Sequence, residues 1–436
     1  MSETTDTYLT LDLALRVGEV LLSSGAGAAD VTATMLSIAS TCGLRNCEVD
    51  LTFTSLSISY QPGPELPSQT QLRQVRQRVS DYSHLTDVDL LVHALVAGEI
   101  DRDEARTRLA SIVSSGHRYT TLAVAIGWGF MGMGTSLVIG GDWIVTLIAL
   151  FATITVNLVR LRMRRMRLPA FYQQVVGGLL ATLLAVAVAA ARVPVDPSLV
   201  ITASIIMLLA GVAFMGALQD ALTGFYVTGA ARTLEALLLT GGIIGGVSGG
   251  LAVAHRAGLQ IHFTPGSAGW SQLPIVLFGA ALTAAAFAFT SYAPVRSLLP
   301  IALVGVAGEF AYRSITIEGF SRAWSSAVAA VVIGVVSYAL AGRIRVPPLI
   351  IVVSTIVPLL PGLSIYTGLF LISEGQTLGL ISLATAAAVA MALAAGVIFG
   401  EYVAQPLKRE AHRLETRLAG PRLVGPFRAR AKSRRG

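Results

Sequence analysis

Residues 357–370 of the chain read VPLLPGLSIYTGLF, an apolar stretch that contains two prolines and two glycines. The segment is apolar enough for a membrane interior, but Pro361 removes a backbone donor and Gly362 lets the chain turn. Non-helical backbone is tolerated at membrane depth only where it is buried in protein or lines a polar cavity. The stretch therefore predicts an interrupted helix inside a helical membrane protein, with a structural kink or a turn at the membrane edge as the alternative.

The composition of the whole chain supports a membrane location. Of its 436 residues 54% are hydrophobic and 13% are charged, and the mean hydropathy is +0.69, whereas soluble domains carry about a quarter charged residues. Residues 1–118 have ordinary polarity, residues 119–400 are mostly long apolar runs, and residues 401–436 are strongly basic. The formal charge of +7 lies in the tail and in short loops beside apolar runs, as the positive-inside rule describes. No nucleic-acid partner is expected.

About ten apolar segments come near the roughly 20 residues that a helix needs to cross a lipid bilayer. The candidate spans are residues 120–139, 143–159, 175–191, 199–217, 237–254, 273–291, 298–311, 324–341, 348–363 and 378–399. Basic residues follow the even-numbered spans, as in RLRMRRMR at residues 160–167, and fill the tail. This distribution predicts a multi-pass plasma-membrane protein with both termini in the cytosol.

Residues 1–118 predict a small cytosolic α/β domain. Two helices are expected before Gly43, and the alternation in EVDLTFTSLSISY, residues 48–60, predicts one or two strands. A short helix at residues 88–97 and another that begins after the N-cap residue Asp101 should follow.

The histidines and cysteines of this domain show no catalytic or metal-binding pattern. His84, His93 and His117 have no partners at a suitable spacing, and Cys42 and Cys47 are interpreted as reduced, unpaired thiols. No enzyme activity, cofactor or metal is therefore expected. The domain has three open roles: gating the inner mouth, sensing substrate, or holding a homo-oligomer together.

The spans divide into two halves of five, residues 119–257 and residues 272–400, followed by the basic tail at 401–436. An odd number of spans inverts the second half relative to the first. GALQDALTGFYVTG (216–229) and GLSIYTGLFLISEG (362–375) match in their terminal glycines at an offset of 146 residues, and each precedes the fifth span of its half. In transporters with inverted repeats, interrupted helices from both halves face the substrate near the membrane midplane. The predicted fold is two inverted five-helix repeats behind a small α/β domain.

These blocks belong to longer motifs: QDALTGFYVTGAARTLEALL (219–238), PGLSIYTGLFLISEG (361–375) with the later GVIFGEYVA (396–404), and LLSSGAGAADVTATMLSIASTCGL (21–44). With them nearly the whole chain resembles the threonine/serine exporter family, in a fused single-chain form with both signature halves. The resemblance implies a secondary transporter that exports small hydroxylated amino acids by alternating access, driven by the membrane potential and the proton gradient. One departure is the sequence Phe-Met-Gly at 214–216, where a Pro-Gly pair would be expected.

Other functions were weighed against this one. The same superfamily includes two-gene relatives linked to dicarboxylate export, so a succinate-like dicarboxylate is the alternative substrate. A binding site for a dicarboxylate should contain several positively charged side chains. The signature blocks place only one arginine, Arg232, which favours a zwitterionic substrate. An ion channel is less favoured, because inverted halves suggest alternating access and no filter motif repeats. The GVSG sequence at 246–249 suggests an intramembrane protease, but His255 lies about 10.5 Å along the same helix, too far for a Ser–His bond of roughly 3 Å.

The first signature block places four candidate site residues. Asp220 and Gly224 stand where the family motif has its acid and its glycine, and Arg232 and Glu235 match its later basic–acidic pair. Ionisable groups in apolar segments are costly and mark candidate sites. The resemblance implies that Asp220 meets the substrate ammonium or carries the coupling proton, and that Arg232 meets the carboxylate. A simple Arg232–Glu235 pair at a loop is the alternative.

The second signature block supplies backbone and hydroxyl groups. Pro361 and Gly362 are expected to expose backbone to the ligand, while Tyr366 and Thr367 offer hydroxyls to a small polar amino acid. At the offset of 146, Tyr366 takes the place of Asp220.

Two further features are predicted from single segments. In GGIIGGVSGG, residues Gly241, Gly245 and Gly249 recur at every fourth position and predict a close-packing helix face. Glu309 and Glu374 are weaker site candidates, expected near the outer interface.

Overall fold

The computed structural model describes residues 3–75, 80–205, 208, 211–258, 270–373 and 375–418; the expectations for Glu374 and for residues 419–436 lie outside it. The N-terminal part contains α1 (Glu3–Ser23), α2 (Ala28–Thr41), β1 (Cys47–Leu51), β2 (Ser55–Tyr60), β3 (Gln69–Gln74), α3 (Tyr82–Val96) and α4 (Arg102–Ser114).

The three strands form an antiparallel meander in the order β1-β2-β3. Both strands that the alternation in residues 48–60 allows are present. Leu56 and Ile58 of β2 are fully buried, because side chains two residues apart share one face of a strand and this face is covered by α1. Cys42 and Cys47 are both free thiols, as predicted, and burial raises the pKa of each.

Side-chain caps fix the starts of α3 and α4. Asp101 accepts a hydrogen bond of 2.8 Å from the backbone N–H of Glu104, as predicted. Helix α3 starts earlier than the predicted residue 88, because Asp81 accepts hydrogen bonds of 3.0 Å from the N–H groups of Ser83 and His84. A carboxylate at this position satisfies donors that have no partner within the helix.

Eight helical segments among the described residues are long and apolar enough to cross a membrane. They are α5 (Thr121–Val138), α6 (Trp143–Arg165), α7 (Ala170–Ala190), α10 (Tyr226–Arg256), η2 (Trp270–Gln272) with α11 (Leu273–Thr290), α12 (Val295–Ile317), α13 (Arg322–Ile344) and the apolar part of α16 (Leu378–Leu418). Large apolar side chains point outward on them: Phe151 is 66% exposed and Leu299 is 70% exposed. The chain is therefore a polytopic membrane protein.

Two further apolar segments contain shorter helices. The first comprises α8 (Pro197–Ile205) and α9 (Gly211–Leu222); the second comprises α14 (Pro348–Ile356), η3 (Val357–Leu359) and α15 (Gly362–Ser373). The predicted interruption before Gly362 is confirmed: Leu360 has an extended backbone with ψ of 140°. In the first half, however, α9 runs unbroken through residues 214–216. The counterpart expected there is wrong, because that sequence has no proline to stop the helix.

The helices of the two halves of the membrane part begin at nearly constant separations along the sequence. Helices α5, α6 and α7 begin at 121, 143 and 170, and α11, α12 and α13 begin at 273, 295 and 322, a separation of 152 residues in each case. The separation is 151 for α8 and α14 (197 and 348) and for α9 and α15 (211 and 362), and 152 for α10 and α16 (226 and 378). This differs from the offset of 146 that the glycine match suggested.

The helix boundaries pair Gly224 with Gly375, and not Gly229 with Gly375. Each glycine lies two residues beyond its helix end, with φ of +95° at Gly224 and +74° at Gly375. Both positions need a left-handed backbone, which glycine adopts without steric cost. At this separation of 151 residues Tyr366 corresponds to Met215, whereas the offset of 146 residues matches it with Asp220.

The glycines of α10 that pack against a neighbouring helix are each one residue later in the sequence than the predicted ones. A Cβ atom at Gly245 would meet nothing within 4 Å, whereas one at Gly246 would overlap the backbone of Val175 in α7. Gly242 and Gly250 also contact α7. The close-packing face predicted from sequence is therefore present, with the glycines in the next register.

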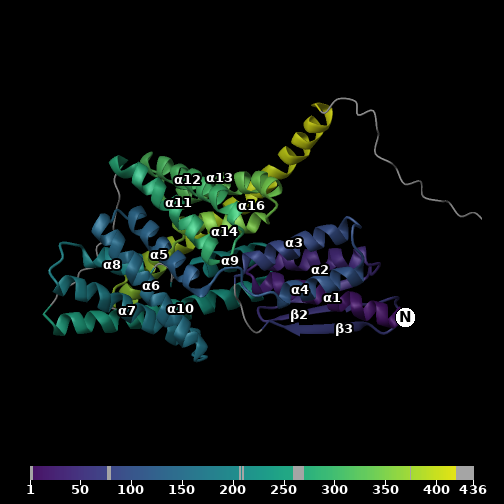
Figure 1. Cartoon of the computed structure of the whole chain (residues 1–436), viewed down its shortest axis with the longest axis horizontal. Coiled ribbons are helices and arrows are strands. Elements are labelled where there is room, and N and C mark those ends of the chain that lie inside the picture. The colour runs from purple at the N-terminus through teal and green to yellow at the C-terminus, as the bar shows by residue number, and fades with distance from the viewer. Residues whose placement is uncertain are drawn as a thin grey trace, which may run out of the picture.

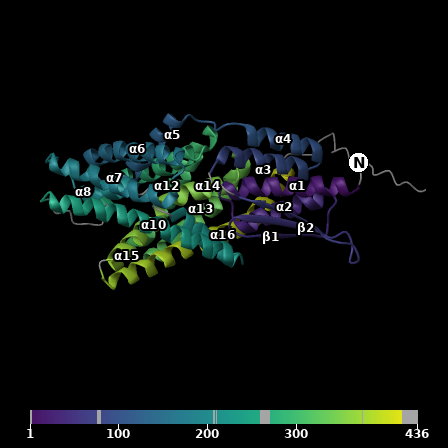
Figure 2. The same ribbon diagram turned by 90° about the horizontal axis from the view of Figure 1, so that it is seen from below.

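The molecule is elongated, with the N-terminal part at one end (Figure 1). Helix α7 packs on α10 as α13 packs on α16, while α9 contacts α16 and α15 contacts α10. The last two contacts join the halves; in Figure 2 α10 and α15 lie side by side. The C-terminal turns of α16 extend beyond the other helices at the end that carries the N-terminal part (Figure 1).

Candidate functional site

The central feature of the candidate site is a buried ion pair between α9 and α10. Arg232 Nη1 lies 2.7 Å from Asp220 Oδ2, and their side chains are 8% and 1% exposed. The two helices are adjacent because the chain reverses at Gly224, where the N–H of Phe225 donates to the carbonyl of Asp220 at 2.8 Å. Gly224 itself is exposed, so its role here is to form the turn.

The N-terminal part completes the surroundings of this pair. The backbone N–H of Ala28, the first residue of α2, donates to Asp220 Oδ1 at 2.9 Å. Arg232 Nη2 donates to the carbonyl of Ala26 at 3.3 Å. Asp220 thus supplies the cap that Gly27, which has no side chain, cannot give to α2. The positive end of the α2 dipole in turn favours the carboxylate.

Because both side chains are buried, each charge needs the other as its compensating partner. An ion taken out of water costs several kcal/mol, and removing one partner of a buried pair costs about 3–5 kcal/mol because the other charge stays uncompensated. The pair also has polar neighbours from α2 and from the loop before it. Asp220 and Arg232 are therefore held by segments that lie far apart in the sequence.

A second carboxyl group lies close to the pair. Burial, then the charges of Glu401 and Asp220, raise the pKa of the Asp30 carboxyl from 3.8 to about 6. Asp30 lies in the first turn of α2 and still reaches water, so it marks the rim of the site. Glu401 of α16 is thus a charged neighbour of Asp30, and it also interacts with Tyr338 of α13.

The first residue of α9 lies against the interruption between α14 and α15. A Cβ atom at Gly211, where α9 begins, would lie 3.0 Å from Cβ of Leu360, where α14 and α15 are separated. Pro361 and Gly362 are buried, and the carbonyl of Pro361 accepts from the N–H of Ile365 at 3.0 Å. Non-helical backbone from the second half therefore lies against the start of a helix from the first half.

Comparison with known proteins identifies relatives of the chain. A family model described as "Putative threonine/serine exporter" matches residues 12–254, and a second, "Threonine/Serine exporter, ThrE", matches residues 276–403. A Mycobacterium tuberculosis protein named "Probable threonine/serine exporter" is 34% identical over 430 residues, which cover 95% of this chain and 80% of that protein. A Corynebacterium glutamicum "Threonine/serine exporter" is 33% identical over 431 residues, covering 97% and 86%. The chain belongs to the threonine/serine exporter family. No solved structure matches it significantly.

In this member of the threonine/serine exporter family, Arg232 forms its ion pair with Asp220. Glu235, the other expected partner, is half-buried, and no Arg232–Glu235 pair occurs among the ion pairs of the described residues. The simple pair at a loop, which was the alternative for Arg232, is therefore not the arrangement that forms.

The second-half hydroxyls lie in a different environment. Tyr366 is 1% exposed and packs in a cluster with first-half residues such as Ile205 and Val247, whereas Thr367 is half-buried. The structure thus inserts α15 into the first half, but it surrounds Tyr366 with apolar side chains and places Asp220 beside α2.

A second ion pair lies within α12, and its arginine contacts the end of α5. Arg313 Nε donates to Glu309 Oε1 at 2.8 Å, and Arg313 Nη2 donates to the carbonyl of Val138 at 3.1 Å. Glu309 is 3% exposed. The sequence marked Glu309 as a weaker site candidate; in the structure it pairs with Arg313 of the same helix, and Arg313 contacts α5.

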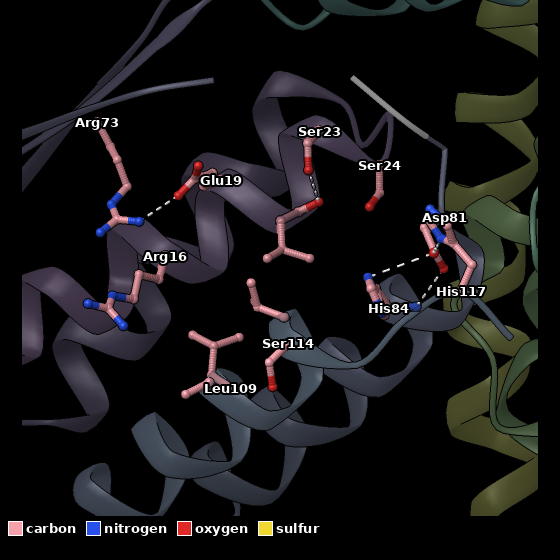
Figure 3. Close-up of a pocket in the computed structure, with 13 residues that line it drawn as sticks. Arg16, Glu19, Ser23, Ser24, Arg73, Asp81, His84, Leu109, Ser114 and His117 are labelled. Carbon is pink, nitrogen blue, oxygen red and sulfur yellow. Dashed lines mark hydrogen bonds and ion pairs between the residues drawn. The ribbon is translucent and has the colours of Figure 1, made fainter. Parts of the chain in front are cut away.

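The N-terminal part has a cavity of about 550 Å³ between α1 and α4 (Figure 3). At one end Asp81 accepts from His117 at 2.7 Å, and His117 stacks on Tyr292 of the α11–α12 loop at 4.4 Å. At the other end Arg73 pairs with Glu19 at 2.6 Å. These groups are paired with each other, and no cluster suited to a metal ion occurs among the described residues.

Sequence reasoning missed the role of residues 24–28 and of Asp30. The segment SGAGA was visible as part of a family-like motif, but small residues carry no chemistry that points to a site. Only the fold shows that its backbone contacts Asp220 and Arg232.

Proposed function

We propose that this chain exports threonine and serine, and that Asp220 and Arg232 bind the ammonium and carboxylate groups of the amino acid. The observation that carries the proposal is the buried ion pair of 2.7 Å in a chain of the exporter family. A zwitterion presents the opposite charge to each residue, so it can enter between them without leaving either charge uncompensated. Charge-assisted hydrogen bonds of this kind are stronger than neutral ones.

The small side chain of the substrate would face the interrupted helices. Backbone groups around Leu360 and Pro361 are where an α-helix cannot satisfy its own hydrogen bonds, and they suit a hydroxyl that both donates and accepts. Tyr366 and Thr367 of the same segment are the further candidates for hydroxyl recognition.

The proposed transport cycle is alternating access between two inverted repeats. The constant separation of helix starts supports a repeat, and the exchanged contacts of α9 with α16 and of α15 with α10 support movement of one half against the other. With α8 and α9 counted as one span and α14 and α15 as another, these two spans and the eight long segments would make ten. The repeats would occupy residues 119–257 and 272–400.

The orientation places the N-terminal part and the basic tail in the cytosol. Figure 1 supports this, because the end of α16 extends toward the same end of the molecule as the N-terminal part. The charge of RLRMRRMR, at the C-terminal end of α6, agrees with the positive-inside rule. We further propose that protons drive export, with Asp220 or Asp30 as the carrier; the Asp30 pKa of about 6 suits reversible protonation near neutral pH.

Efflux from cells that lack their own exporter tests the proposal. The cells are loaded with a threonine-containing dipeptide, and threonine and serine are measured outside for wild type, Asp220→Asn and the surface control Glu104→Gln, with and without an uncoupler. Wild type and the control should export, and Asp220→Asn should not. Efflux at the level of the empty vector from folded wild-type protein would refute amino-acid export, and succinate efflux in the same cells would then identify a dicarboxylate exporter.

A further inference from the structure

The backbone of residues 24–28 occupies the groups that the substrate is proposed to bind. We propose that this segment, the α1–α2 loop, competes with the amino acid for Asp220 and Arg232 and must leave them before substrate binds from the side of the N-terminal part. The inference rests on the proposed function and adds a regulatory element to the same site.

The polarity of the loop matches that of an amino acid. It offers a donor to Asp220, the N–H of Ala28, and an acceptor to Arg232, the carbonyl of Ala26. Ala26 and Ala28 are 3% and 0% exposed, and Asp220 is 1% exposed, so water does not reach the carboxylate past the loop. The loop and a substrate therefore exclude each other at these two residues.

The loop binds in a way that allows exchange. Its two hydrogen bonds join a neutral peptide group to a charged side chain, whereas a zwitterion would bring a full charge to each. The interactions of the substrate are therefore stronger, and displacement of the loop by substrate is favourable.

The sequence of the loop permits both close approach and departure. A Cβ atom on Gly27 would lie 3.7 Å from Asp220 Oδ1, so no side chain stands between the backbone and the ion pair. Gly25 has φ of +95°, a conformation that glycine adopts without strain.

Other contacts hold the N-terminal part in place when the loop leaves. The N–H of Tyr82 donates to the carbonyl of Ser291 at 2.8 Å, and the His117 ring stacks on Tyr292 at 4.4 Å. These contacts are with the second half and do not involve the α1–α2 loop. The loop can therefore move without release of the whole N-terminal part.

The substitution Ala28→Pro tests the competition directly. Ala28 is the first residue of α2, where proline is well tolerated, and Gly27 has φ of −66° and ψ of 150°, which suits the residue before a proline. Proline removes the N–H that binds Asp220 and places its ring carbon there instead. The matched control is Thr121→Pro at the first position of α5, where Thr120 has nearly the same backbone, with φ of −68° and ψ of 152°.

Threonine binding is measured on the purified full-length protein by calorimetry. Because the apparent affinity scales with the fraction of molecules whose site is open, Ala28→Pro should lower the Kd for threonine by about tenfold or more, and Thr121→Pro should leave it unchanged. An unchanged or higher Kd in folded Ala28→Pro protein would refute the competition. If wild type and both variants all fail to bind threonine, the proposed function fails instead.

A second measurement uses the unmodified protein and does not depend on the folding of a variant. Amide hydrogen exchange is followed in residues 24–30 with and without threonine. The competition predicts that threonine increases exchange at Ala28, because its N–H loses Asp220 as partner. Equal or slower exchange at Ala28 under saturating threonine would refute the loop as a competitor.

Discussion

The strongest energetic prediction concerns the coupling between Asp220 and Arg232. Two unit charges about 4 Å apart attract by about 4 kcal/mol at an effective dielectric constant of 20, and these side chains are 1% and 8% exposed. Asp220→Asn removes one charge at nearly constant size, and Arg232→Gln removes the other while it keeps a polar, though shorter, side chain. We expect each single substitution to lower the free energy of unfolding by about 3–5 kcal/mol.

The double variant separates the ion pair from other effects. It leaves no uncompensated charge, so its loss should be smaller than the sum of the single losses by more than about 1 kcal/mol, within the range of about 0.5–3 kcal/mol for residues in direct contact. Unfolding is followed in mixed micelles with a denaturing detergent, with the fluorescence of the four tryptophans as the signal.

A surface ion pair provides the control for this cycle. Glu104 and Arg108 of α4 lie 2.5 Å apart, but their side chains are 47% and 53% exposed, so the same cycle should give a coupling below about 1 kcal/mol. Additive losses for Asp220→Asn and Arg232→Gln, within about 0.5 kcal/mol, would contradict the reasoning that the two charges stabilise each other.

Three further predictions follow from individual contacts. The pKa of Asp30 is raised from 3.8 to about 6 in the folded protein, so its contribution to stability is complete below pH 3.8 and is lost as the pH rises through 6. The Tm of the wild type should therefore fall between pH 4 and 7, and Asp30→Asn should flatten this fall. An equal fall of Tm in both proteins would contradict the raised pKa. Gly246→Ala should lower the yield of monodisperse protein because the new Cβ atom overlaps the backbone of Val175. Gly245→Ala should leave the yield unchanged, because its Cβ atom meets nothing within 4 Å. Equal yields would refute the assignment of Gly246 to the face of α10 that packs on α7. Gly224→Ala should lower the free energy of unfolding by about 1–2 kcal/mol, because φ at Gly224 is +95°. If Gly224→Ala lowers it by less than Gly245→Ala, a substitution within a helix, in the same detergent assay, the left-handed turn is contradicted.

Local sequence signals predicted the elements of the fold well. Apolar runs identified the membrane helices, Asp101 predicted a helix start, and Pro361 with Gly362 predicted the interruption that separates α14 from α15. Each of these signals acts within a few residues, through hydrophobicity, capping or the missing proline N–H. They are readable without any knowledge of the tertiary structure.

Register was less predictable than the elements. The match of two glycine pairs gave an offset of 146 residues, whereas the helix starts are separated by 151 or 152, because a chain with 43 glycines offers several alignments. The prediction for the packing face of α10 also differed from the structure by one residue, because two adjacent rows of glycines were possible. The spacing of glycines fixes a helical periodicity, but which of two adjacent glycine rows faces a neighbour depends on where that neighbour lies.

The sequence by itself determined the class of protein, the positions of the membrane helices and the ionisable residues that apolar segments cannot bury without compensation. Only the tertiary structure decided what compensates them: Asp220 binds the N–H of Ala28, 192 residues away, and Arg232 pairs with Asp220 and not with the nearer Glu235. The physical reason is that a backbone N–H or carbonyl is present in every residue. Its use as a partner for a buried charge leaves no mark in the sequence and follows from which segments the fold brings together.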